Sequence, residues 1–435
     1  MYPRIDKKKY TDVVFILLII YGVSTSLSIA VTNIILGLLI LIVLINFVLG
    51  KKFFSTWEGL PLLYLYFWRA LRVFFNLSNW VKYGGKFWAH LPYFIIPQLN
   101  VKKIKIIIYS TLSVASFIAI LGILQYIFNF NYPFLKNQPF VNCRFIGLNF
   151  RNALHTGGYY SIIATVSFVF FCCSKENTKI KICLFILTLI NFVAIGLNYS
   201  RTYYVAILAT GLLILLREKI KWLIFGTGLV FLLFIGIFKY SYTLKNKVTS
   251  IFDTKENLSN VMRLWMWGTA LKIMKEHPII GVGYGNWEKE VKIYFENEKE
   301  QYPLLWIISR SYKVGRSEKG ILNVFKSHPH NTYLNVGVSE GLIGLILFVL
   351  FWFGNSIMAF KRARMTEKGS TTYALNLAVG YSIIMLMIAG FFENNLTTAR
   401  ILLPITFLMG LSYTDTDKYR DNEIMEKKRK MTIER

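Results

Sequence analysis

Charged residues are scarce in this chain of 435 residues. They make up 17% of it, whereas soluble domains carry about 25%. Those present lie in clusters between apolar runs, and hydrophobic residues reach 54% with a mean hydropathy of +0.46. This composition excludes an ordinary soluble protein and predicts an all-α polytopic membrane protein.

Metal-binding residues are also few, with four cysteines and five histidines. No two of them recur at the C-x-x-C or H-x-x-x-H spacings typical of zinc sites, so the sequence predicts no metal site. Cys172, Cys173 and Cys183 lie in or beside apolar segments, where a thiol usually packs as a small apolar group. The cysteines therefore do not indicate a disulfide framework.

Lysine and arginine exceed the acidic residues by 27 charges. In a soluble chain such an excess would suggest a nucleic-acid partner. In a membrane protein it first indicates positively charged cytoplasmic loops. We therefore expect the lipid bilayer as a partner and no nucleic acid.

About 20 mostly apolar residues are needed for a helix to cross a bilayer. By this measure the chain contains about 12 transmembrane helices, at 13–30, 32–49, 59–75, 88–101, 106–128, 155–173, 182–198, 202–216, 222–238, 335–358, 373–392 and 399–414. The third and fourth are the weakest, because Arg69 and Arg72 interrupt one and Pro92 and Pro97 the other.

The basic clusters between these spans set the topology. With both termini in the cytoplasm, every basic cluster faces the cytoplasm, as the positive-inside rule requires. This arrangement divides the chain into spans one to nine (1–238), a large external helical loop (239–334), spans ten to twelve (335–414) and a cytoplasmic tail (415–435).

Ionisable residues at a membrane border are costly, so each is a candidate for function. In the predicted topology five such places fall on the external side. They are Arg201 in the turn between spans seven and eight, Arg263 on a helix of the large loop, His328 with His330 and the adjacent Asn331, Glu393 with Arg400 beside the last external turn, and Arg69 with Arg72.

Three of these places have simple structural explanations. Arg201 can anchor its turn at the membrane interface. Arg263 can lie on a helix surface or stack on Trp265 or Trp267, and the two loop histidines can be bystanders. These alternatives stay open at the level of sequence.

The other two places also have structural explanations. Glu393 and Arg400 can form an ion pair that closes their turn. Arg69 and Arg72 lie three residues apart on one helix face, where they can bind a lipid phosphate or mark the external end of a poor span.

Taken together, several arginines and a histidine fall on one side of the membrane without an acidic cluster. Guanidinium groups bind phosphate oxygens bidentately. A histidine beside them can deprotonate a hydroxyl nucleophile, and arginines can neutralise a departing pyrophosphate. The pattern favours a phosphate-bearing ligand at the outer leaflet.

Three motifs occur in a recognisable order. They are Ser200-Arg201-Thr202, then Met262-Arg263-Leu264 followed by His277 to Gly283, then His328-Pro329-His330-Asn331-Thr332-Tyr333-Leu334 followed by Glu340 to Gly344. In these motifs the chain resembles the bacterial O-antigen ligase family, within the group of O-antigen ligases, O-antigen polymerases and protein O-oligosaccharyltransferases.

The resemblance implies a fold like that of C-type glycosyltransferases, in the bacterial inner membrane, with the large loop in the periplasm. It implies transfer of a glycan from undecaprenyl pyrophosphate to a sugar hydroxyl of the lipid A core, without metal, nucleotide or other cofactor. His330 would activate the acceptor, Arg201 and Arg263 would hold the pyrophosphate, and His328 would support them. Glu393 and Arg400 resemble positions seen in some ligases.

Two alternatives to a ligase remain. A polymerase or a protein O-oligosaccharyltransferase would use a similar donor and differ only in its acceptor. A lipid-linked glycan transporter would use the arginines for phosphate binding alone. Internal repeats and discontinuous helices at the midplane are typical of transporters, and the sequence contains no evident repeat.

Overall fold

The computed structural model of the protein describes residues 7–48, 59–74, 87–96, 99–129, 140–141, 144–146, 152–218, 258–298 and 328–413. Its elements are α1 (Lys7–Leu27), α2 (Ile29–Val48), α3 (Leu60–Phe74), η2 (Trp88–His90), α5 (Pro92–Ile95), α6 (Val101–Phe128), β1 (Phe140–Val141), β2 (Arg144–Phe145), α7 (Ala153–Cys173), α8 (Thr178–Asn198), α9 (Arg201–Glu218), α12 (Leu258–Glu276), α13 (Trp287–Glu298), α16 (Thr332–Met365), α17 (Thr371–Gly390) and α18 (Ala399–Ser412).

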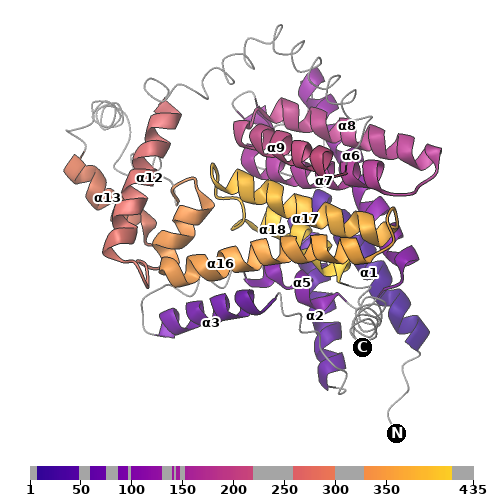
Figure 1. The fold of residues 1–435 in the computed structure, drawn as a ribbon, viewed down its shortest axis with the longest axis horizontal. Coiled ribbons are helices and arrows are strands. Elements are labelled where there is room, and N and C mark those ends of the chain that lie inside the picture. Colours follow the sequence, from indigo (N-terminus) through magenta and orange to yellow (C-terminus); the bar gives the residue numbers. More distant parts are fainter. Residues whose placement is uncertain are drawn as a thin grey trace, which may run out of the picture.

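Five of the described helices are long and apolar enough to cross a membrane: α6, α7, α8, α16 and α17. The apolar stretches of α7 and α17 are 78% and 83% buried, whereas that of α8 is 28% buried. The first two therefore form the centre of the bundle, while α8 lies at its surface (Figure 1). This confirms the prediction of a helical membrane protein.

Small and hydroxyl-bearing residues explain why α7 can lie at the centre. Helices in a membrane associate through close packing and interhelical hydrogen bonds, because lipid supplies no hydrophobic force between them. The Thr188 hydroxyl of α8 donates to Ser167 of α7 at 3.0 Å, and Asn191 of α8 donates to Ser116 of α6 at 2.7 Å. These buried bonds join the three helices.

One predicted span is wrong as a continuous helix. Residues 88–101 form the single 3₁₀ turn η2 and the four-residue helix α5, and α6 begins only at Val101. Ile96 has an extended backbone (φ −75°, ψ 121°) because the following Pro97 disfavours the helical conformation before it. The predicted span at 222–238 and the tail at 415–435 lie outside the described residues, and the count of about 12 spans stays a prediction.

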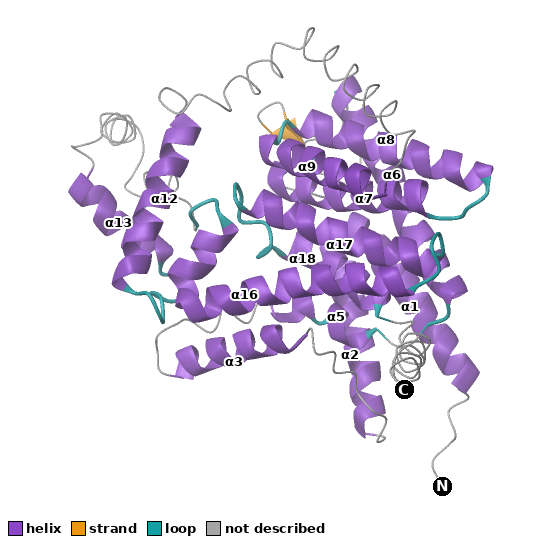
Figure 2. Cartoon of the chain, in the orientation of Figure 1, coloured by secondary structure: helices purple, strands orange, loops and turns teal. Residues whose placement is uncertain are grey.

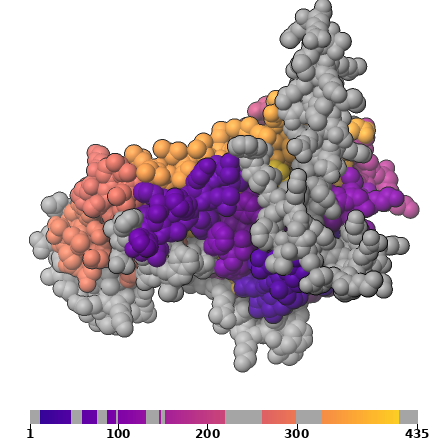
Figure 3. Space-filling view, turned by 90° about the horizontal axis from the view of Figure 1, so that it is seen from below, coloured from indigo at the N-terminus to yellow at the C-terminus, as the bar shows by residue number. Residues whose placement is uncertain are grey.

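At one end of the molecule α12 and α13 form a small unit with its own apolar cluster (Figure 3). Trp265, Trp287 and Phe295 are buried there, and Val338 of α16 completes the cluster. This unit supplies the part of the predicted large loop that is described. Teal connections in Figure 2 show that the turn before α16 and the turn between α17 and α18 both face it.

A sharp corner at Gly341 divides α16 into a short first part and a long second part. The backbone of Gly341 has φ 70° and ψ −171°, which is essentially restricted to glycine. The turn after α12 docks into this corner: Val282 N donates to Val338 O at 2.8 Å, and Leu342 N donates to Pro278 O at 2.8 Å. The corner therefore brings together the turn after α12 and the first part of α16, which belong to separate motifs in the sequence.

Arginines of α3 hold this corner from outside. Arg69 donates to both carboxylate oxygens of Glu340, at 2.6 to 3.0 Å, and Arg72 donates to the carbonyls of Ser339 and Gly281. Glu340 and Arg72 are buried. These contacts are with protein groups, whereas the sequence suggested a lipid phosphate or the end of a weak span. Removing one partner of a buried pair typically costs about 3–5 kcal/mol.

Replacing Gly341 by alanine tests the corner. A Cβ atom there would lie 2.0 Å from Ile279 O, and the backbone alone would cost about 1–3 kcal/mol. We expect Gly341→Ala to lower the unfolding temperature of the purified protein in detergent by several degrees or to prevent folding. Gly354→Ala, also in α16 but with no atom within 4 Å of the new Cβ, is the control and should not lower it. Equal unfolding temperatures for the two variants would contradict a tightly packed corner.

Candidate active site

The start of α16 is fixed by Asn331. Its side-chain oxygen accepts hydrogen bonds from Tyr333 N and Leu334 N at 2.9 and 3.0 Å, which caps the helix. Its amide nitrogen donates to Phe391 O at 3.0 Å. The next residue, Thr332, donates from its hydroxyl to Glu393 O at 2.9 Å. Asn331 thus ties α16 to the turn that follows α17.

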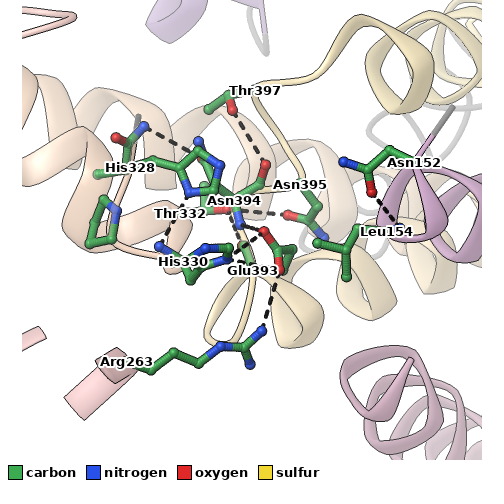
Figure 4. A network of polar contacts seen from close by, with 12 residues as sticks. Asn152, Leu154, Arg263, His328, His330, Thr332, Glu393, Asn394, Asn395 and Thr397 are labelled. Carbon is green, nitrogen blue, oxygen red and sulfur yellow. Dashed lines mark hydrogen bonds and ion pairs between the residues drawn. The ribbon is translucent and has the colours of Figure 1, made fainter. Parts of the chain in front are cut away.

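His330, just before this cap, has a left-handed backbone with φ 52°. This conformation costs an L-residue about 1 kcal/mol or more, so the surrounding contacts must hold it. Its Nδ1 lies 3.1 and 3.2 Å from the two carboxylate oxygens of Glu393 (Figure 4). Because an ionised carboxylate can only accept, Nδ1 carries the proton and Nε2 of the neutral ring is left as a proton acceptor.

Glu393 is buried in the turn between α17 and α18. Burial alone would raise its pKa, but the hydrogen bond from His330 and the positive charges of Arg263 and of the protonated forms of His330 and His328 lower that pKa to about 2. Arg263 Nη2 lies 3.6 Å from Oε2, and Asn394 N donates to Oε1 at 3.2 Å. The carboxylate therefore stays ionised and orients the His330 ring.

His328 packs its ring against that of His330, with centroids 4.7 Å apart, and its Nδ1 accepts from His330 N at 3.3 Å. The ligating atoms of His328, His330 and Glu393 lie within 4.8 Å of one another, so these three residues can hold a metal ion, which the histidine spacing did not indicate. However, Nδ1 of both rings is already bound to protein groups. The same three side chains also form a hydrogen-bond network with one another.

Two side chains of α12 reach this network from one helix face. Arg263 forms the ion pair with Glu393, and one turn later Trp267 donates from Nε1 to Pro329 O at 3.0 Å. The Trp267 ring also lies against Phe392, with centroids 6.4 Å apart. Trp267 thus contacts the residue before His330 and the residue before Glu393. The sequence offered it only as a stacking partner for Arg263.

Arg201, the first residue of α9, also reaches α12. Its Nη2 donates to Asn260 Oδ1 at 3.3 Å. Asn260 lies three residues before Arg263, so both project from the same side of α12. The structure thereby brings Arg201, Arg263 and His330 into one neighbourhood.

A pocket opens beside the histidines. It is lined by Asn152, Leu154, His155, Tyr203, His328, His330, Glu393, Asn394, Asn395, Thr398 and Ile401. Arg400 of α18 acts electrostatically on His155, as does Glu393. No motif in the sequence pointed to His155 or Tyr203. His155 is the first residue of the predicted span 155–173, and an ionisable residue at a membrane border is itself a signal of function.

The arrangement combines a proton acceptor, a carboxylate that orients it and two nearby guanidinium groups. Histidine Nε2 can take a proton from a hydroxyl. The resulting imidazolium would be stabilised by Glu393, and the arginines can bind an anionic group. The site is therefore suited to activating a hydroxyl beside a phosphate-bearing reactant.

Residues 183–349 match the family model described as O-antigen ligase. The matched segment contains Arg201, Arg263, His328 and His330, but it ends within α16 before Glu393. A comparison with curated proteins found no match. The match supports the predicted resemblance to this family over residues 183–349.

The low pKa of Glu393 predicts a specific pH dependence of stability. A carboxylate with a depressed pKa stabilises the fold above its ordinary pKa of about 4.5, and this contribution is lost as the pH falls towards 2. We expect Glu393→Gln to lower the unfolding temperature in detergent at pH 6, and the difference from the unmodified protein to shrink as the pH approaches 3. A difference that is constant across this range would contradict an ionised, paired Glu393.

Proposed function

From the match of residues 183–349 to the O-antigen ligase family model, we propose that the chain is a glycosyltransferase that moves a glycan from undecaprenyl pyrophosphate to a hydroxyl acceptor. The observation that carries the proposal is the His330–Glu393 pair with Arg263 in contact and with Arg201 of α9 bonded to Asn260, which lies one turn before Arg263 on α12. This arrangement places a base and cationic groups within one site.

In this reaction the acceptor oxygen attacks the anomeric carbon of the donor sugar, and the bond from that carbon to the pyrophosphate oxygen breaks. The acceptor proton passes to Nε2 of His330. The pyrophosphate leaves with the bonding electrons, and Arg201 and Arg263 neutralise its charge. Glu393 holds the ring and stabilises the imidazolium. Since the leaving group is already activated, no ATP and no metal is required.

The direction of the helices favours an anionic reactant here. Four helices, α7, α9, α16 and α18, have their first turns at the pocket or its rim. The first turn of a helix carries a partial positive charge, which stabilises anions. Together with the two arginines these helix ends support a pyrophosphate-bearing donor.

Charge distribution supports a periplasmic site. The site lies where α7, α9 and α16 begin, while Arg217 and the cluster Lys361 to Arg364 lie at the opposite ends of α9 and α16. Under the positive-inside rule the basic ends face the cytoplasm. We therefore propose an inner-membrane protein with about 12 spans, its termini cytoplasmic and residues 239–334 forming the periplasmic loop.

For the acceptor we propose a sugar hydroxyl of the lipid A core, on the strength of the family resemblance. A polymerase that joins O-units and a ligase that glycosylates protein are the alternatives within the same fold. A transporter of lipid-linked glycan would need no base, and the ordered His330–Glu393 pair favours an enzyme.

The lipopolysaccharide of a deletion strain distinguishes these acceptors. Loss of all polymer on the core, with lipid-linked polymer accumulating, is the result we expect for a ligase. Core carrying a single repeat unit would instead indicate a polymerase. Unchanged lipopolysaccharide would indicate a protein acceptor and would contradict the proposed one.

Removing the base tests the catalytic role of His330. General-base catalysis contributes about 10²–10⁴ in rate, so we expect His330→Ala to lower kcat for glycan transfer by at least a hundredfold in the purified enzyme. His277→Ala, at an exposed histidine in the turn after α12, is the matched control and should retain full activity. A fully active His330→Ala enzyme would rule out this assignment.

Lysine substitutions test the two arginines. Lysine keeps the charge but loses the bidentate fork that fits phosphate, so we expect Arg201→Lys and Arg263→Lys each to reduce kcat/KM for the donor by about tenfold or more. Arg364→Lys, at the far end of α16, is the control. Normal donor kinetics in both active-site variants would show that these arginines do not bind the pyrophosphate.

A further inference from the structure

Trp267 of α12 makes two contacts that the proposed reaction has not used. Its Nε1 donates to Pro329 O at 3.0 Å, and its ring lies against Phe392 with centroids 6.4 Å apart. Pro329 directly precedes His330, and Phe392 directly precedes Glu393. One side chain therefore touches both of the segments that carry the base and its carboxylate.

The peptide group that joins Pro329 to His330 is held at both of its polar atoms. Its carbonyl oxygen accepts the hydrogen bond from Trp267, and its N–H donates to Nδ1 of His328 at 3.3 Å. The next residue, Asn331, caps α16. The left-handed backbone of His330, with φ 52°, lies between these two fixed points. Such a conformation persists only where the surrounding contacts hold it, and the bond from Trp267 is one of those contacts.

A relaxed backbone at His330 would misplace its ring. If φ returned to the negative values that L-residues prefer, the side chain would leave in a different direction. Its Nδ1 would then no longer face the two Glu393 oxygens, which now lie 3.1 and 3.2 Å away. The base needs that contact, because the proton held on Nδ1 leaves Nε2 as the acceptor. The hydrogen bond from Trp267 thus acts on the base through the backbone.

The same face of α12 also carries Arg263. It lies four residues before Trp267, and its Nη2 is 3.6 Å from Oε2 of Glu393. Arg263 and Trp267 together dock α12 against both members of the pair. An aromatic ring alone could pack against Phe392, but only a ring with an N–H group can also bind Pro329 O.

Trp265, two residues earlier on the same helix, faces a different neighbour. Its Nε1 donates to Glu298 Oε2 at 3.0 Å, and its ring packs edge-on against Phe295 with centroids 6.0 Å apart. Both partners belong to α13, so Trp265 holds α12 and α13 together. The two tryptophans donate hydrogen bonds of equal length from one helix, and only that of Trp267 reaches the segment of the base.

We infer that Trp267 is a positioning residue, which fixes the backbone before His330 and so keeps the His330 ring against Glu393. This inference rests on the proposed function, because it concerns the base of that reaction. Trp267 binds neither the donor nor the acceptor, and its N–H proton is not transferred. Loss of its hydrogen bond therefore lowers the rate of transfer and leaves the binding of both substrates as it is.

Removal of the indole N–H tests this inference. With the purified full-length enzyme, a polyprenyl-pyrophosphate oligosaccharide and lipid A core, we expect Trp267→Phe to lower kcat by about three- to tenfold, the effect of one lost hydrogen bond. KM for the donor and KM for the acceptor should stay unchanged. Replacement of Trp267 by 3-benzothienylalanine, which keeps the shape of tryptophan but has sulfur in place of N–H, should have the same effect. It serves as the test variant should Trp267→Phe fail to fold.

Trp265→Phe is the matched control, since it loses the same kind of hydrogen bond from the same helix, and it should keep its full kcat. Three results would overturn the inference while leaving the proposed function intact. They are an unchanged kcat in the Trp267 variants, an equal loss of kcat in Trp265→Phe, and a rise of either KM by the factor expected for kcat. An unmodified enzyme that forms no product would overturn the proposed function itself.

Discussion

The site depends on the hydrogen bond from Nδ1 of His330 to the carboxylate of Glu393, at 3.1 Å. It joins the residue before α16 to the turn between α17 and α18, two segments 63 residues apart. The pair is buried, and burying a carboxylate is costly unless charge and hydrogen bonds compensate. His330, Arg263 and the backbone of Asn394 supply that compensation, so three elements must dock together for the carboxylate to remain ionised.

The docking of His330 on Glu393 also requires the corner at Gly341. The part of α16 that bears His330 can turn towards Glu393 only because Gly341 breaks the helix, and the turn around Gly281 packs into the break. Arg69 and Arg72 close the corner from α3. In the sequence, the residues around Gly281 and the Arg69–Arg72 pair look like parts of a binding site. In the structure they instead hold the part of α16 that bears His330.

It could be predicted that Arg201, Arg263 and His330 lie on the same side of the membrane. Each lies at a helix end or on a helix of the large loop, and the basic clusters between the spans indicate on which side those segments lie. The role of Arg69 could not, because its partner Glu340 lies 271 residues away and no local pattern records that pairing. The broken segment 88–101 was predicted as a weak span, although its prolines already indicated the break. His155 was missed because, in the sequence, it looks like one polar residue at the start of an apolar run.

The central claim is that this site forms a glycosidic bond and releases the lipid carrier. It is tested most directly by mass spectrometry of a reaction between the purified protein, a polyprenyl-pyrophosphate oligosaccharide and lipid A core. We expect glycosylated core and free polyprenyl pyrophosphate in equal amounts, with no requirement for ATP and no loss of product in EDTA. Recovery of the donor intact with unmodified core, while lipid-linked glycan crosses the bilayer of reconstituted vesicles, would contradict it.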